Sequence, residues 1–296
     1  MKLPPFIGEL LKAVVYGNIW VALCAVSMYA CTVLLHHLAW NSLLAGSIFG
    51  ATIFIYNYHR LFRKEKIYQA YVSERHQWIL MHHAKLQGLA VFGFLLAAGC
   101  FLPFLNKTLI IRLSPFLILA LFYVIPVWKR GNKWLRVRDI PYFKIFLVAA
   151  VWSFVTVVLA FLADDPLWLP DVGAWISIVS RFVFIFAITL PFDIRDLEHD
   201  RSNGLITFAG TLGVPLVNRI SAFLLTLVAL LAVFSAMGGY YVYPAAGGMI
   251  LSCLFTGALA LNIDEQSSEW MYAGFLDGTM IDQLVWIALF SNVFSG

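Results

Sequence analysis

The sequence predicts an all-α, polytopic membrane protein: a bundle of nine transmembrane helices around a central cavity, in a single domain over residues 1–296. Composition is the first observation behind this prediction. Of the 296 residues, 61% are hydrophobic and only 12% are charged, with a mean hydropathy of +0.84. A soluble domain is about 45–50% apolar and about 25% charged. A soluble enzyme, a disordered chain and a nucleic-acid-binding module are therefore excluded.

The second observation is a series of nine apolar segments, most of them near the length of about 20 residues that a bilayer-crossing helix needs. A short amphipathic segment, Pro5–Ala13, precedes the first of them and is expected to lie at the membrane surface. The predicted spans are Val14–Leu35, Ala39–Tyr58, Leu86–Leu105, Thr108–Trp128, Pro141–Ala163, Val172–Phe192, Val214–Met237, Tyr240–Ile263 and Thr279–Phe294.

The third observation is the placement of the basic residues. Lysines and arginines gather in the connections after the second, fourth and sixth predicted spans, whereas the connections on the other face carry Lys107 and Arg112. The positive-inside rule then places the N-terminus and the basic connections in the cytoplasm. Because the number of spans is odd, the C-terminus is expected outside. Membrane lipids are the expected surroundings of the whole chain.

An acidic cluster follows the sixth predicted span. Asp193, Asp196 and Asp200 are spaced i, i+3 and i+7, so they share one face if the helix continues. Carboxylate oxygens together with substrate phosphates are the usual ligands of Mg²⁺, and the cluster therefore suggests a magnesium clamp on a diphosphate. The alternative is a solvated helix extension in which Arg195 and Arg201 form local ion pairs with the carboxylates.

The segment from Leu190 to Gly213 closely resembles the second aspartate-rich motif of the UbiA superfamily of intramembrane prenyltransferases. A second stretch, Tyr123 to Arg130, is similar to a Tyr-x-x-Pro-x-x-Lys-Arg pattern that members of this family carry at the end of their fourth span. The residues that carry the two resemblances are Asp193, Asp196, Asp200, Gly204, Thr207, Leu212 and Gly213, and then Tyr123, Pro126, Lys129 and Arg130, followed by Pro141 and Lys144.

The resemblance implies a UbiA-like fold and a Mg²⁺-assisted prenyltransferase. Such an enzyme transfers an isoprenyl group from an isoprenyl diphosphate to a lipophilic, often aromatic, acceptor. Carried over residue by residue, it makes Asp193, Asp196 and Asp200 the catalytic residues and the metal ligands. It also implies a multi-pass protein of a bacterial inner membrane, with the active-site loops in the cytoplasm.

The first aspartate-rich motif of the family is missing at the end of the second span. Asn57 matches its start, but Leu61 and Glu65 stand at the aspartate positions, and basic side chains surround them. Guanidinium groups bind phosphate oxygens in a two-pronged geometry. The candidate diphosphate-binding residues are therefore Asn57, Arg60, Arg63, Lys129 and Arg130.

Two alternatives to this assignment stay open. The basic helix end could pair with the acidic cluster and close the site, which would make the chain a non-catalytic membrane protein that binds or passes a lipid or isoprenoid. Lys129 and Arg130 could also contact anionic lipid headgroups instead of a diphosphate.

Arg181 lies inside the sixth predicted span. A charge at such a depth suggests a function. It could instead extend toward the outer surface or pair with Asp171 at the start of the span.

Overall fold

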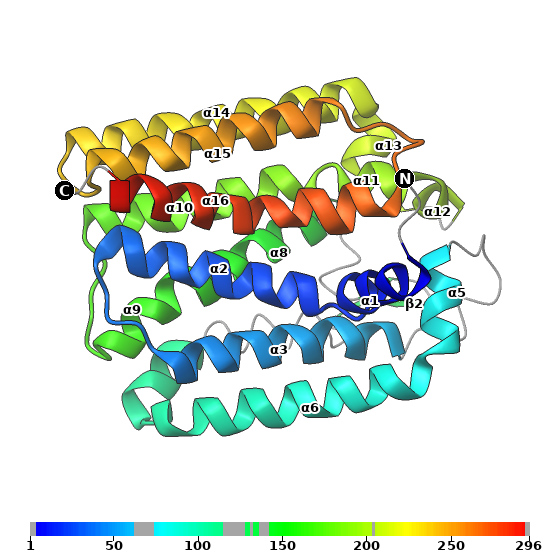
Figure 1. Cartoon of the computed structure of the whole chain (residues 1–296), viewed down its shortest axis with the longest axis horizontal. Coiled ribbons are helices and arrows are strands. Elements are labelled where there is room, and N and C mark those ends of the chain that lie inside the picture. The colour runs from blue at the N-terminus through cyan, green and yellow to red at the C-terminus, as the bar shows by residue number, and fades with distance from the viewer. Residues whose placement is uncertain are drawn as a thin grey trace.

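The computed structural model describes residues 4–61, 74–114, 128–130, 133–135, 142–202 and 205–293. Long helices run side by side along the longest axis of the molecule (Figure 1), which confirms the predicted all-α class. The helices are α1 (Pro5–Tyr16), α2 (Ile19–His36), α3 (Ser42–Leu61), α5 (Glu74–Met81), α6 (His83–Phe101), α8 (Phe143–Ser153), α9 (Leu159–Asp164), α10 (Val172–Thr189), α11 (Phe192–Arg195), α12 (Leu197–Ser202), α13 (Phe208–Leu212), α14 (Val214–Met237), α15 (Tyr243–Leu261) and α16 (Asp277–Val293).

Within the part of the chain that the structure describes, seven helical stretches are long and apolar enough to cross a membrane. The helix α3 contributes a shorter apolar stretch, Ser42–Tyr58, and most of the predicted span Thr108–Trp128 lies outside the described residues. The predicted count of nine and the predicted central cavity therefore stay predictions. The seven stretches are Ile19–His36, His83–Phe104, Phe143–Asp164, Val172–Arg195, Val214–Met237, Tyr243–Leu261 and Met271–Ser291.

The helix α14 shows why these helices suit a lipid environment. One face packs into the bundle through Val217, Leu225 and Val228, which are buried, while Phe223 and Leu230 on the other face are exposed. A helix that is apolar on every side is expected where the outer solvent is itself apolar. The packing and the exposed surface of α14 are therefore both consistent with a transmembrane helix.

The N-terminal segment differs from its prediction in one boundary. The surface helix α1 extends to Tyr16, and the first long helix, α2, begins at Ile19 rather than at Val14. The chain turns between them at Asn18, whose backbone is left-handed with φ 65°. The side-chain amide of Asn18 donates a hydrogen bond to Asn57 of α3. The sequence pattern missed this turn because the residues on both sides of it are apolar.

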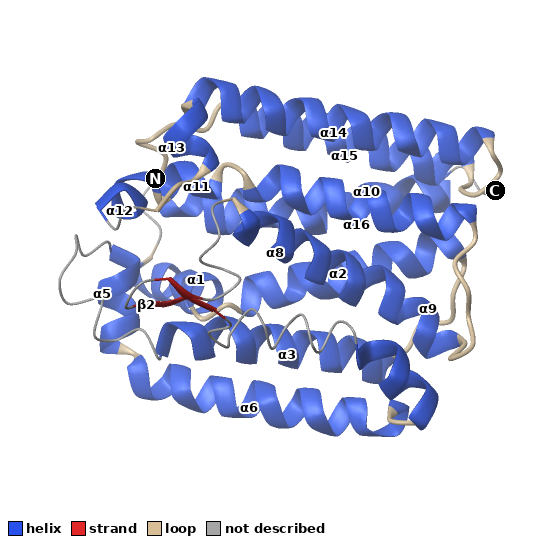
Figure 2. Cartoon of the chain, turned by 180° about the vertical axis from the view of Figure 1, so that it is seen from behind, coloured by secondary structure: helices blue, strands red, loops and turns tan. Residues whose placement is uncertain are grey.

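Two short strands, β1 (Trp128–Arg130) and β2 (Lys133–Leu135), form an antiparallel hairpin that the sequence analysis did not predict. Two interruptions of the long helices are π-helical turns, Phe154–Val158 between α8 and α9, and Met271–Leu276 before α16. The hairpin lies at the same end of the bundle as α1, α5 and α12 (Figure 2). We call this the acidic end, because α11 and α12 carry the predicted aspartate cluster there.

The helices α3 and α6 approach each other closely at two glycines. A Cβ atom added to Gly93 would lie 2.8 Å from the carbonyl oxygen of Gly50, and one added to Gly50 would lie 2.6 Å from that of Gly93. Small residues allow such backbone contact in membrane bundles, where packing rather than water exclusion drives helix association. These glycines therefore fix the distance between the two helices.

We expect Gly93→Ala to lower the free energy of unfolding by about 1–3 kcal/mol, because the added methyl group overpacks this contact. Thermal melts of the detergent-solubilised protein measure the change. The matched control is Gly99→Ala on the same helix, where an added Cβ meets nothing within 4 Å. Equal melting temperatures for the two variants would contradict the close approach.

Candidate functional site

The backbone after α10 bends at Pro191, which has no N–H to continue the helical ladder. A tighter bond, from the N–H of Asp193 to the carbonyl of Leu190 at 3.1 Å, starts α11. The helix is interrupted again at Asp196, with φ −89° and ψ 2°, before α12 begins. The three aspartates therefore do not lie on one unbroken helix, although each is still within one turn of the next.

Two of the three carboxylates are buried. Asp193 is 4% exposed and Asp200 is 7% exposed. The Oδ2 atom of Asp193 accepts a hydrogen bond of 3.2 Å from the backbone N–H of Phe208, at the start of α13. Lys144 of α8 and Asp200 both lie near enough to act on the charge of Asp193. The alternative of a fully solvated helix extension does not describe these two carboxylates.

The third carboxylate, Asp196, is held by its neighbour Arg195. The Arg195 Nε–Oδ1 distance is 2.8 Å and the Nη2–Oδ2 distance is 3.2 Å, so both carboxylate oxygens are engaged. Burial alone would raise the pKa of Asp196, but the Arg195 guanidinium outweighs it and lowers that pKa to about 2. The predicted local ion pair with Arg195 is therefore present.

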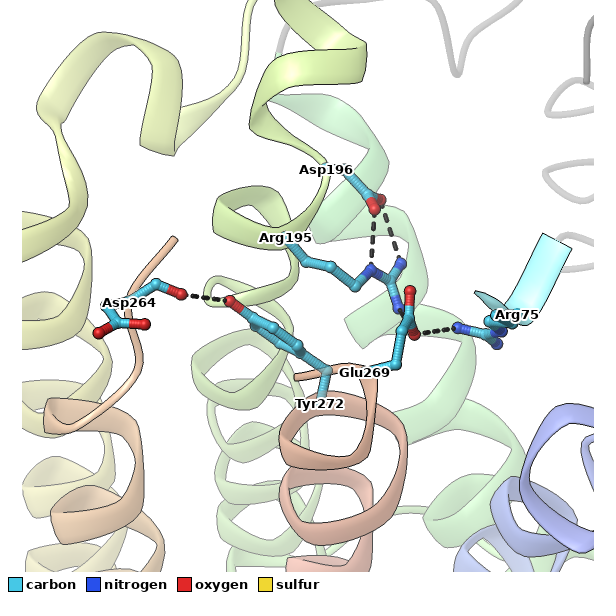
Figure 3. A network of polar contacts seen from close by, with 6 residues as sticks. All are labelled: Arg75, Arg195, Asp196, Asp264, Glu269 and Tyr272. Carbon is cyan, nitrogen blue, oxygen red and sulfur yellow. Dashed lines mark hydrogen bonds and ion pairs between the residues drawn. The ribbon is translucent and has the colours of Figure 1, made fainter. Parts of the chain in front are cut away.

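Arg195 belongs to a larger polar network, which joins three parts of the chain (Figure 3). Its Nη1 atom lies 3.8 Å from Oε2 of Glu269, and the same oxygen lies 3.1 Å from Nη1 of Arg75 in α5. The Arg195 guanidinium also lies 4.9 Å from the centre of the Phe192 ring, within range of a cation–π contact. Arg195 thus lies between the carboxylates of Asp196 and Glu269, and Glu269 also pairs with Arg75.

The end of α3 holds Asn57 in a different way from the one predicted. Asn57 is fully buried, and its Oδ1 accepts a 2.9 Å hydrogen bond from Asn18. Its Nδ2 donates to the backbone carbonyls of Gly17 and Ile53, at 3.1 and 3.0 Å. Both amide hydrogens are used, so a phosphate would reach them only by replacing one of these bonds. In this structure Asn57 ties the α1–α2 turn to α3.

The remaining predicted phosphate ligands cannot be placed at the level of side chains. The backbones of Arg60, Lys129 and Arg130 belong to α3 and β1, at the acidic end, but their side chains lie outside the described part. All of Arg63 lies outside it. Their binding roles stay predictions.

A protein-only metal site is not formed by the described carboxylates. Among the residues that the structure describes, no group of three or more His, Cys, Asp or Glu side chains is arranged to hold a metal ion. Mg²⁺ is usually held by one or two carboxylates plus substrate phosphates. Asp193 and Asp200 supply donors of that kind, so the donor set fits an ion shared with a diphosphate.

An aromatic cluster lies next to Asp193. Phe208, whose N–H binds the Asp193 carboxylate, has its ring centre 4.7 Å from that of Tyr142 and 6.0 Å from that of Phe186. Phe146 lies 4.7 Å from Phe186 and extends the cluster along α8. The acidic end therefore combines buried carboxylates with a wall of aromatic rings.

The sequence pattern does not identify Arg75 or Glu269 as members of this network. Both lie in polar connections, where charges are common, and neither belongs to a recognisable motif. Glu269 stands among other acidic residues before α16, and spacing alone does not distinguish it from exposed Glu265. Only the folded bundle brings it between Arg75 and Arg195.

The comparisons with known proteins agree with this geometry. Residues 82–277 match the model of the UbiA prenyltransferase family. The chain is also similar to a solved structure described as the apo structure of a UbiA homolog from Aeropyrum pernix K1, with a TM-score of 0.59 and 13% identity, over 96% of this chain and 98% of that one. At this identity the likeness shows the fold alone. A search of curated proteins finds no match.

We expect Glu269→Gln to destabilise the protein by about 1–3 kcal/mol, because it leaves Arg75 and Arg195 without their shared counter-ion. Thermal melts of the detergent-solubilised protein test this. Glu265→Gln, in the same connection and exposed, is the control and should melt like the wild type. Equal melting temperatures for the two variants would mean that the network does not stabilise the fold.

The low pKa of Asp196 gives a pH dependence. In an unfolded chain an Asp titrates near pH 3.9, so the ion pair stabilises the protein fully above that pH and loses its effect as the pH falls toward about 2. We expect the difference in melting temperature between wild type and Asp196→Asn, measured with EDTA, to be equal at pH 7 and pH 5. A difference that shrinks over that interval would contradict the assignment.

Proposed function

The chain belongs to the UbiA prenyltransferase family, and from this premise we propose that it transfers an isoprenyl group from an isoprenyl diphosphate to a lipophilic acceptor in the membrane. The observation that carries the proposal is the pair of buried carboxylates, Asp193 and Asp200, at the acidic end of an apolar bundle. The apolar isoprenyl tail of the substrate needs an apolar environment, and its charged diphosphate needs a polar one.

Two buried carboxylates repel each other and disfavour ionisation unless a cation balances them. Asp193 and Asp200 would hold Mg²⁺ together with the diphosphate oxygens, and Asp196 would join them if Arg195 released it. Magnesium, when bound, neutralises charge that develops on the leaving diphosphate. Lys144, which already acts on Asp193, adds a positive charge on the α8 side of the site.

The aromatic cluster of Tyr142, Phe146, Phe186 and Phe208 supports the organic half of the reaction. When the C–O bond breaks, its electron pair leaves with the diphosphate and an allyl cation remains. The faces of aromatic rings attract cations, and the apolar wall excludes water that would capture the cation. The acceptor then forms the new bond to carbon and loses a proton.

The charge pattern supports an orientation of the site relative to the two sides of the membrane. Lysines and arginines are concentrated in the connections at the acidic end. The positive-inside rule therefore favours an acidic end that faces the cytoplasm of a bacterial inner membrane, with the C-terminus on the other side.

One observation favours a second candidate function, a non-catalytic protein that binds or passes an isoprenoid lipid. Asp196 is already neutralised by Arg195, and Arg195 is itself tied to Glu269. A site closed by internal ion pairs has less need of a metal. Absence of diphosphate binding in the experiment below would favour this candidate over the enzyme.

We expect detergent-solubilised protein to bind an isoprenyl diphosphate in a Mg²⁺-dependent manner, measured by calorimetry. Asp193→Asn should weaken binding by at least about tenfold, the equivalent of one lost ionic contact. Asp165→Asn is the matched control, because Asp165 caps a turn at the opposite end through its bond to the N–H of Leu167.

Other results of the same titration separate the alternatives. Binding that needs no metal and is lost in Arg60→Ala would mean that basic side chains have replaced the ion. Absence of binding under every condition would overturn the proposal and leave a fold relative with a different task.

A further inference from the structure

A second polar site lies inside the bundle, away from the acidic end. Arg181 of α10 is 5% exposed and lines a small internal cavity together with Ser177, Ser180, Tyr241 and Gln283. Twelve residues separate Arg181 from Asp193, roughly 18 Å at the rise of a helix. The cavity is thus distinct from the proposed diphosphate site.

Among the residues that the structure describes, Arg181 has no acidic partner. Its Nη1 atom donates to the carbonyl of Met28 at 2.6 Å and to Oγ1 of Thr156 at 2.8 Å, and both partners are neutral. None of the residues that line the cavity is Asp or Glu. Residues 115–127, which lie outside the described part, contain no acidic residue either. The expectations that Arg181 extends to the surface or pairs with Asp171 are both wrong.

Asp171 has another role, which explains why it does not pair with Arg181. Its Oδ1 atom accepts a 2.7 Å hydrogen bond from the N–H of Ala174 and caps the start of α10. A guanidinium buried in an apolar bundle without a counter-ion is costly. The charge of Arg181 therefore calls for a negative partner that the described chain does not supply.

Further donors surround the cavity. Ser180 Oγ and Gln283 Nε2 are buried and have no hydrogen-bond partner within the described structure, and each residue is 1% exposed. His36 Nε2 lies 2.6 Å from Ser177 Oγ, which lies 2.5 Å from the hydroxyl of Tyr241. If His36 donates along this chain, the hydrogen of Tyr241 is left free. Buried polar groups left unpaired in this way are rare in proteins.

We propose that this cavity binds a monatomic anion of the size and charge of chloride. The cavity is small and has room for about one water-sized particle, so it excludes larger organic anions. An anion would balance Arg181 and accept hydrogen bonds from Ser180, Gln283 and Tyr241. Because these groups come from α10, from α16 and from the residues before α15, the ion stabilises the contact between these helices.

The first test compares melting temperatures of the detergent-solubilised protein in sodium chloride and sodium gluconate at equal ionic strength. Gluconate is too large for the cavity. We expect chloride to raise the melting temperature by about 2–4 °C with a saturating dose response, as for a ligand that binds only the folded state. The same melting temperature in both salts would overturn the proposal.

Two variants assign the response to the cavity. Gln283→Glu supplies Arg181 with a carboxylate and should abolish the chloride response. Ser180→Ala removes one donor and should raise severalfold the chloride concentration that gives half of the stabilisation. This variant tests the proposal if Gln283→Glu does not fold. Ser235→Ala is the matched control, since Ser235 Oγ is also buried and unpaired within the described structure but does not line the cavity.

Bromide identifies the occupant directly. Crystals grown in sodium bromide should show an anomalous peak beside Arg181. A peak without anomalous signal would mean an ordered water molecule, and it would overturn the proposal. A wild-type chloride response in both Gln283→Glu and Ser180→Ala would do the same.

Discussion

Inside this apolar bundle, a buried polar group must find its partner within the protein, because lipid offers neither donors nor acceptors. The constraint accounts for two of the long-range polar contacts in the fold. Asn18 and Asn57 satisfy each other and hold the turn between α1 and α2 against α3. Glu269 pairs with Arg75 and Arg195 and links α5 and α11 to the segment that precedes the π-helical turn before α16.

The same constraint explains the character of the acidic end. Asp193 accepts a hydrogen bond from the N–H of Phe208, and Asp196 is paired with Arg195, so these two carboxylates are held in place at this end of the bundle. Carboxylate oxygens together with substrate phosphates are the usual ligands of Mg²⁺. The neighbouring aromatic rings provide a surface that is apolar but attractive to positive charge. Metal, diphosphate and allyl cation would all find complementary surroundings within this one region.

The sequence was a good guide where the signal is local. Long apolar stretches predicted α14 to the residue, and the spacing of the aspartates identified the segment that the fold turns into α11 and α12. The spacing of the aspartates gives no sign of the interruption at Asp196, where the backbone leaves the helical region with φ −89° and ψ 2°. The π-helical turns and the hairpin were also missed, since neither has a clear periodic signature.

Contacts between residues far apart in the chain could not be predicted from the sequence. Asn57 was interpreted as a phosphate ligand because it matched a motif, and its contacts with Asn18 and Gly17 come from residues about 40 positions away. Glu269 and Arg75 are 194 residues apart. The sequence places Arg181 inside a span, but only the packed helices show that its described partners are the carbonyl of Met28 and the hydroxyl of Thr156.

The proposed function depends on the acidic end holding the diphosphate. The most direct measurement is a structure of the protein with Mn²⁺ and an isoprenyl thiodiphosphate, whose C–S bond resists cleavage. We predict an anomalous Mn²⁺ peak beside Asp193 and Asp200, with the apolar tail against Phe146 and Phe186. A diphosphate bound elsewhere in the molecule, with Asp193 still holding only the N–H of Phe208, would contradict the claim.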